Sequence, residues 1–224
     1  MHVCLFDIDG TLLNTGGAGQ AAMEAAIDSE FGVTKPIEGI STAGRTDRAI
    51  TTDLFEYYGL ESDVETRDRF LSAYLHHLAV LLNELDGLVL PGIPELLETL
   101  SVREDIVLGL LTGNYRDGAR LKLEYYALHQ HFGFGGFGDD HLHRDDVARE
   151  ALEQARANLD GAVDLNRVWV IGDTPADIRC GRAIGANVVA VATGLYLWQD
   201  LQAAQPDHLL TDFSDPESLL RLLP

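Results

Sequence analysis

The stretch V-C-L-F-D-I-D-G-T-L-L-N-T, residues 3–15, decides the fold of this chain. Its first four residues are apolar and precede a turn signal, which is typical of a buried strand in a parallel sheet. Asp7 and Asp9 follow at the carboxyl end of that strand, where open α/β sheets hold their ligands. Residues two apart on a strand point the same way, so the two carboxylates converge and need a cation or a shared proton. The alternative at this point is an ordinary strand-terminal turn, in which Asp and Gly are common.

The composition describes an acidic globular protein with 46% hydrophobic residues and a formal net charge of −20 over 224 residues. That charge argues against nucleic acid and anionic membrane surfaces as partners, and nothing in the sequence indicates an oligomeric state. The sequence contains no apolar run of about 18 residues, so no transmembrane helix is expected. Cys4 and Cys180 fall in a predicted buried strand and a predicted helix, which favours reduced thiols and a cytoplasmic location.

Strand and helix patterns alternate through most of the chain, which predicts a doubly wound parallel α/β sheet with right-handed crossovers. The further strands are predicted at residues 106–111, 167–171, 187–192 and around 209–210. Residues 15–88 interrupt this alternation, because their apolar residues recur at helical spacing. Gly16, Gly17 and Gly19 at the start of that segment predict a hinge. We therefore expect a Rossmann-like core, residues 1–14 and 89–224, with an inserted all-helical cap, residues 15–88.

Two more predicted strands end in polar clusters. Thr112, Gly113 and Asn114 offer a hydroxyl and backbone amides that can cradle a phosphate, although T-G-N is also a good helix-start turn. Asp173 stands at the end of the strand at 167–171, and Asp177 lies in the first turn of the next helix. The carboxyl ends of parallel strands share one edge of the sheet, so these residues should join Asp7 and Asp9. Such an oxygen-rich set suits Mg²⁺, which also accepts substrate phosphate as a ligand.

The insert contains one polar, basic stretch, G-I-S-T-A-G-R-T-D-R at residues 39–48. Thr46 or Asp47 is predicted to cap the helix that follows. A helix N-terminus also suits anions, so Arg45, with Thr46 beside it, is a candidate for substrate binding.

The order of D-I-D-G-T, T-G-N and G-D-T-P-A-D resembles the haloacid dehalogenase-like (HAD) hydrolase superfamily over essentially the whole chain. The helical segment after the first motif is similar to the cap of its phosphoglycolate-phosphatase-like branch. The resemblance implies a Mg²⁺-dependent phosphatase that acts on a small phosphorylated metabolite. It implies that Asp7 is the nucleophile that forms an aspartyl-phosphate, and that Asp9 is the general acid/base. Thr112 would then hold the phosphoryl group beside the amides of Gly113 and Asn114, and Mg²⁺ would be bound by Asp7, Asp9 (through its carbonyl), Asp173 and Asp177.

One motif departs from the family pattern, in which a lysine neutralises the nucleophile and the phosphate. No lysine stands at the usual place, but Arg144 does, 32 residues after Thr112 (144 − 112) and 29 before Asp173 (173 − 144). Lys122, only 10 residues after Thr112 (122 − 112), is the other candidate. Arginine is preferred here because it can grip carboxylate and phosphate oxygens together.

Related chemistries make different demands on the sequence. The 2-haloacid dehalogenases lack the second aspartate, so Asp9 argues against them. Phosphonatases need a cap lysine, and Lys35 is the only lysine before Lys122, which argues against that activity. A β-phosphoglucomutase-like phosphotransferase uses the same core and stays open. A non-catalytic binding module on a HAD core is the further alternative, although the acidic motifs are intact.

Overall fold

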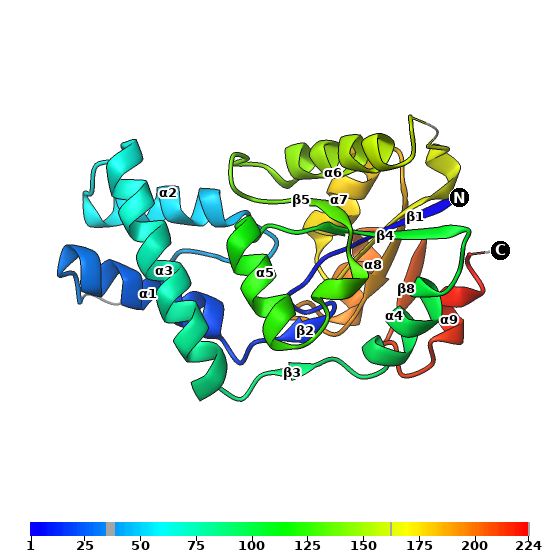
Figure 1. Cartoon of the computed structure of the whole chain (residues 1–224), viewed down its shortest axis with the longest axis horizontal. Coiled ribbons are helices and arrows are strands. Elements are labelled where there is room, and N and C mark those ends of the chain that lie inside the picture. The colour runs from blue at the N-terminus through cyan, green and yellow to red at the C-terminus, as the bar shows by residue number, and fades with distance from the viewer. Residues whose placement is uncertain (35–38, 162, 224) are drawn as a thin grey trace.

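The protein is built on one six-stranded parallel sheet with the strand order β5-β4-β1-β6-β7-β8 (Figure 1). Its computed structural model describes residues 1–34, 39–161 and 163–223, so Lys35 lies outside the described residues. The strands are β1 (His2–Phe6), β4 (Ile106–Leu111), β5 (Phe134–Gly136), β6 (Val168–Gly172), β7 (Asn187–Val191) and β8 (His208–Leu210). The predicted doubly wound parallel fold is confirmed, with β1 paired to β4 and β6 at the centre of the sheet.

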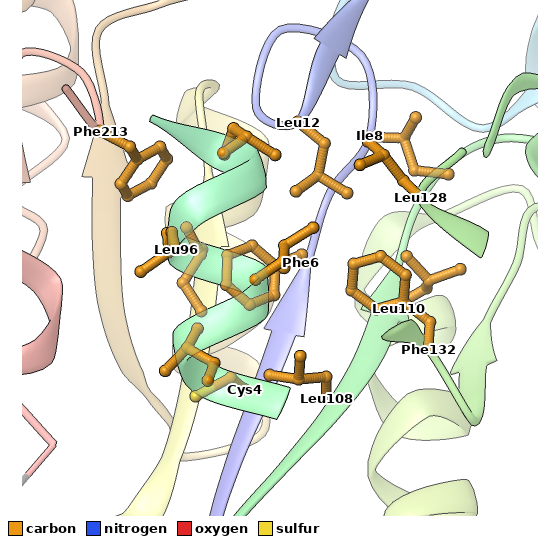
Figure 2. Close-up of a cluster of buried hydrophobic side chains, with 14 of the residues drawn as sticks. Cys4, Phe6, Ile8, Leu12, Leu96, Leu108, Leu110, Leu128, Phe132 and Phe213 are labelled. Carbon is orange, nitrogen blue, oxygen red and sulfur yellow. The ribbon is translucent and has the colours of Figure 1, made fainter. Parts of the chain in front are cut away.

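Helices cover both faces of the sheet because successive side chains of β1 point to opposite sides. Cys4 and Phe6 pack with Leu96 and its neighbours on one face, as Figure 2 shows. Val3 and Leu5 pack on the other face. The first face carries α4 (Ile93–Ser101), α5 (Arg116–Tyr125) and α9 (Glu217–Leu220); the second carries α6 (Arg144–Asn158), α7 (Pro175–Ala183) and α8 (Trp198–Ala203). Because the six strands of this sheet are parallel, their carboxyl ends all lie along one edge of the sheet.

Within its described residues, the inserted segment forms three helices that lie beside the sheet (Figure 1). They are α1 (Ala18–Phe31), α2 (Asp47–Tyr58) and α3 (Val64–Glu84). Their apolar faces share a hydrophobic cluster, which Tyr115 of the core also joins; its insert members include Leu54, Phe55, Phe70, Tyr74 and Leu78. Phe55 and Phe70 meet edge to face, with ring centroids 5.5 Å apart. The helical periodicity of this segment therefore reports packing among these helices.

The chain enters and leaves the insert through a two-stranded antiparallel ribbon. In it, β2 (Leu13–Asn14) pairs with β3 (Leu88–Val89). Strands of two residues are too short to produce a periodic signal, and the sequence did not predict them. Gly16 and Gly17 have φ values of 65° and 90°, as expected for a turn before a helix, but Gly19 lies within α1. Gly19 therefore belongs to the helix, while a hinge at Gly16 and Gly17 stays a prediction.

The two cysteines, Cys4 and Cys180, are free and buried. Their burial agrees with the predicted reduced thiols, while the cytoplasmic location stays a prediction. Among the described residues, no helix combines the length and apolarity needed to cross a membrane.

Candidate active site

The carboxyl ends of β1, β4 and β6 border a cavity of about 370 Å³. The core contributes most of the predicted site residues to its wall: Asp7, Asp9, Gly113, Asn114, Lys122, Arg144 and Asp173. The insert contributes residues of α1, α2, α3 and the loop before α2, including Arg45. The cavity thus lies between the two parts of the chain.

Three buried carboxylates gather beside the cavity. Asp7, Asp173 and Asp177 each present an oxygen, and these atoms all lie within 4.8 Å of one another. Arg144, at the start of α6, lies 3.3 Å from Asp7 Oδ2 and also pairs with Asp177. Burial raises the pKa of Asp7 to about 6, although Arg144 opposes the shift. Burial, reinforced by the other two carboxylates, raises the pKa of Asp173 well above its usual range. One guanidinium therefore faces three acids, which leaves the cluster short of positive charge.

Asp173 is fixed by the turn that follows β1. Thr11 Oγ1 donates a hydrogen bond of 3.1 Å to Asp173 Oδ1. Gly10 has a φ of 82°, and a Cβ there would collide with the Asp173 carboxylate. Only glycine fits here, since it tolerates positive φ and has no Cβ to collide with Asp173. The D-G-T sequence after the first strand therefore brings the β1 and β6 ends together.

Asp177 has its two oxygens already engaged. Its Oδ1 accepts from Arg144, and its Oδ2 accepts from the backbone N and the Oγ1 of Thr174, at 3.0 and 2.7 Å. Thr174 and Asp177 thereby form a capping box at the start of α7. Asp177 is thus placed to orient Arg144 and to support the cluster from behind.

Asp9 is held by a different cation. Lys122 Nζ, buried in α5, donates to both carboxylate oxygens of Asp9 at 2.8 and 2.7 Å, and to Asn114 Oδ1 at 2.6 Å. Asn114 Nδ2 donates to Asp9 Oδ2 at 2.8 Å. The two candidate cations are therefore separated, with Arg144 on Asp7 and Lys122 on Asp9. This arrangement favours Arg144 for the position that a lysine occupies in the family pattern.

The loop after β4 carries the predicted phosphate cradle. Thr112 is fully buried, and its Oγ1 accepts hydrogen bonds from the backbone N and the Nδ2 of Asn114, at 3.3 and 2.7 Å. Because the hydroxyl is the acceptor in both bonds, it can still donate its own proton. At Gly113, a Cβ would meet the carbonyl oxygen of Arg45. Glycine thus allows the backbone of the insert to lie directly against this loop.

The two predicted binding residues of the insert differ in their placement. Arg45 lines the cavity, but its guanidinium is paired with Asp53 at 2.6 Å. Thr46 is fully buried, and its Oγ1 accepts from Ala49 N as the N-cap of α2. The Thr46 hydroxyl is used for helix capping and does not line the cavity, and substrate binding by Thr46 stays a prediction.

Asp47 is a site residue that the sequence did not indicate. Its backbone N donates to Gly113 O at 2.7 Å, and its Oδ2 accepts from Tyr115 N at 2.8 Å. Burial raises the pKa of Asp47 to about 7, with Lys122 as the main opposing influence. An aspartate in the first turn of a helix is usual, so the sequence showed only a helix start. Its contacts with the phosphate loop join distant parts of the chain.

The match to known proteins spans nearly the whole chain. Residues 4–191 match the family model described as haloacid dehalogenase-like hydrolase. The N-acetylmuramic acid 6-phosphate phosphatase of Pseudomonas aeruginosa is 29% identical, over 100% of this chain and 95% of the relative. The phosphoglycolate phosphatase of Synechococcus elongatus is 30% identical, over 96% of this chain and 95% of the relative. The structure of CbbY from Rhodobacter sphaeroides in complex with phosphate superposes with a TM-score of 0.75 at 19% identity, covering 96% of each chain.

A parallel sheet whose central strand ends in D-I-D-G-T, beside a cluster of buried carboxylates, defines a hydrolase of the haloacid dehalogenase type. The chain belongs to the haloacid dehalogenase-like hydrolase family.

Proposed function

We propose that this enzyme is a Mg²⁺-dependent phosphatase that hydrolyses a small phosphomonoester through an aspartyl-phosphate on Asp7. The single observation that carries the proposal is the cavity in which Asp7, Asp9 and Asp173 meet the Gly113–Asn114 loop. Its size of about 370 Å³ suits a small ligand, since such pockets usually measure about 300–1,000 Å³. Relatives along nearly the whole chain are named as phosphatases of small phosphorylated compounds, which supports the same activity.

The acidic cluster fits Mg²⁺. Its donors are all carboxylate oxygens, which hard divalent cations prefer, and its three acids face one guanidinium. Asp7 and Asp173 would hold the ion directly, with the Asp9 carbonyl, while Asp177 orients Arg144. Bound Mg²⁺ neutralises the carboxylates and the equatorial oxygens of the transferring phosphoryl group.

Asp7 is placed to attack phosphorus. In the first step an Asp7 oxygen forms a bond to phosphorus, the phosphorus–alcohol bond breaks, and protonated Asp9 gives its proton to the departing alcohol. In the second step Asp9 takes a proton from water, whose oxygen attacks phosphorus and releases phosphate and the Asp7 carboxylate. Lys122 and Asn114 orient Asp9 for both transfers through the hydrogen bonds that hold its carboxylate.

The remaining groups of the site stabilise the phosphoryl charge. Arg144 contacts Asp7 through Nη2 and lines the cavity, so its charge lies beside the phosphoryl group. The Thr112 hydroxyl and the amides of Gly113 and Asn114 supply neutral donors from the other side. Donors held in place before the reaction stabilise the transition state without reorganisation.

We also propose that residues 15–88 act as a cap that closes over the site. The helices of the insert pack mainly on one another, and the Asp47 and Arg48 amides donate to Gly113 O and Gly138 O in the core, at 2.7 and 3.3 Å. These contacts, together with the ring contact of Tyr74 with Tyr115 at a centroid distance of 6.0 Å, would break and re-form as substrate enters and phosphate leaves. Closure would exclude bulk water from the acyl phosphate.

The test is hydrolysis of an aryl phosphate, 4-nitrophenyl phosphate, with and without Mg²⁺. Asp7→Asn should abolish turnover while the folded structure persists, and Asp28→Asn, the same exchange at an exposed site on α1, should leave turnover unchanged. Turnover by Asp7→Asn at the wild-type rate would refute the mechanism. A β-phosphoglucomutase-like enzyme would instead interconvert glucose-phosphate isomers, so that assay, run beside phosphate release, separates the two activities.

A further inference from the structure

The insert supplies the part of the cavity wall that a leaving group meets, because the core residues hold the phosphoryl group. This wall combines carbon surface with neutral or acidic hydrogen-bonding groups: Met23, Ile50, Tyr74, Gln20 and Asp47. Asp47 uses one carboxylate oxygen for Tyr115 N and can accept a substrate hydroxyl with the other.

Each cation that lines the cavity within the described residues is already paired with a carboxylate. Arg144 pairs with Asp7 and Asp177. Lys122 spends its three donors on Asp9 and Asn114.

Arg45 is the cation that the insert brings to the cavity, and it too is engaged. Its Nη1 donates to Asp53 Oδ2 at 2.6 Å and to Ser41 O at 3.3 Å. Asp53 does not line the cavity, so it acts on the cavity through its ion pair with Arg45. A second anionic group on the substrate would therefore meet the carboxylate of Asp47. Among the described residues that line the cavity, it would find no cation without a carboxylate partner.

We propose that the leaving group is an uncharged, hydroxyl-bearing alcohol of a few carbons, with the phosphoryl group as the only anion of the substrate. The inference rests on the proposed phosphatase activity and specifies its substrate class. The carbons pack against Met23, Ile50 and Tyr74, and a hydroxyl donates to Asp47. A substrate that carries a carboxylate, like the one in the name of the phosphoglycolate phosphatase relative, is disfavoured because like charges placed side by side cost binding energy.

Two substrates of equal length test this preference. In 2-hydroxyethyl phosphate a neutral CH₂OH stands where 2-phosphoglycolate has a carboxylate. At pH 8, where Asp47 is ionised, kcat/KM should be at least about tenfold higher for the neutral ester. Equal or better hydrolysis of 2-phosphoglycolate, with aryl phosphate turnover intact, would overturn the inference alone. If the wild-type protein also fails to hydrolyse the aryl phosphate, the proposed phosphatase activity is refuted, and this inference with it.

A substitution at Asp53 tests the role of its ion pair with Arg45. Asp53→Ala should free Arg45 and reduce the preference for the neutral ester at least about threefold, through a lower KM for 2-phosphoglycolate. Asp68→Ala removes an equal charge from the exposed surface of α3 and should leave the preference unchanged. An unchanged preference in Asp53→Ala, or an equal shift in Asp68→Ala, would contradict the assignment.

Discussion

Replacing Asp47 by Asn tests the effect of the buried charge on the residue that links the insert to the phosphate loop. Burial raises the pKa of Asp47 from an ordinary 3.8 to about 7; Lys122 and the amide of Tyr115 oppose the shift, while Asp9 and Asp139 reinforce it. Asparagine keeps the shape of the side chain and a carbonyl oxygen for the Tyr115 amide, but it cannot ionise. The variant therefore removes the charge and preserves the hydrogen bond.

The sign of the pH effect follows from the raised pKa. Between pH 4 and 7 the folded protein retains a proton that the unfolded chain has released, so the free energy of unfolding falls as pH rises. A rise of the Asp47 pKa from 3.8 to about 7 corresponds to about 4 kcal/mol in total. Of this, about 2–3 kcal/mol falls between pH 5 and pH 8. Asp47→Asn escapes this loss, because it has no group to ionise.

Urea unfolding at pH 5 and pH 8 measures the effect. Relative to the wild type, Asp47→Asn should gain about 2–3 kcal/mol in the free energy of unfolding on going from pH 5 to pH 8. Asp28→Asn, at an exposed position, should show no such gain. A difference between Asp47→Asn and the wild type that is the same at both pH values would refute the burial argument.

The other predictions concern the two cations and the turn after β1. Arg144→Met should lower kcat on an aryl phosphate by about 10²–10³-fold and cost about 3–5 kcal/mol of stability, because it leaves Asp7 and Asp177 buried without their cation. Arg144→Lys should recover most of the activity and most of the stability. If Arg144→Lys loses as much of each as Arg144→Met, the positive charge does not explain the role of Arg144. Lys122→Met should lower kcat with a smaller stability loss, of about 1–2 kcal/mol, since the Asp9 side chain is 41% exposed and water can replace the cation. Gly10→Ala should raise the Mg²⁺ concentration needed for half-maximal activity at least about tenfold by displacing Asp173, and an unchanged Mg²⁺ dependence would contradict that placement.

The sheet was predictable because its strands are buried on both faces. Residues 106–111 form a continuous apolar run, and β4 occupies these residues. Parallel strands also bring their carboxyl ends to one edge, so Asp7, Thr112 and Asp173 could be placed together without knowing the strand order. Periodicity within residues 15–88 likewise indicated helices, but it could not show that β2 and β3 pair where the chain enters and leaves the insert.

The contacts that cross between the insert and the core were not predictable. Thr46 and Asp47 carry the same local signal, that of a helix start, yet Thr46 caps α2 while Asp47 also contacts the phosphate loop. The different partners of Lys122 and Arg144 are also set by tertiary structure, since they depend on which side of the cavity α5 and α6 lie. Sequence spacing identified both cations and could not assign their partners.

The short ribbon of β2 and β3 has a consequence for how such enzymes diversify. Asn14 and Leu88 are paired neighbours, so the two points where the insert joins the core lie side by side. A segment attached in this way can be lengthened, shortened or exchanged for another without stretching the chain on which it sits. The reacting carboxylates stay on the sheet, while the walls that select a leaving group come from the exchangeable part. Substrate range can therefore change by replacement of one continuous piece of chain, with the chemistry left intact.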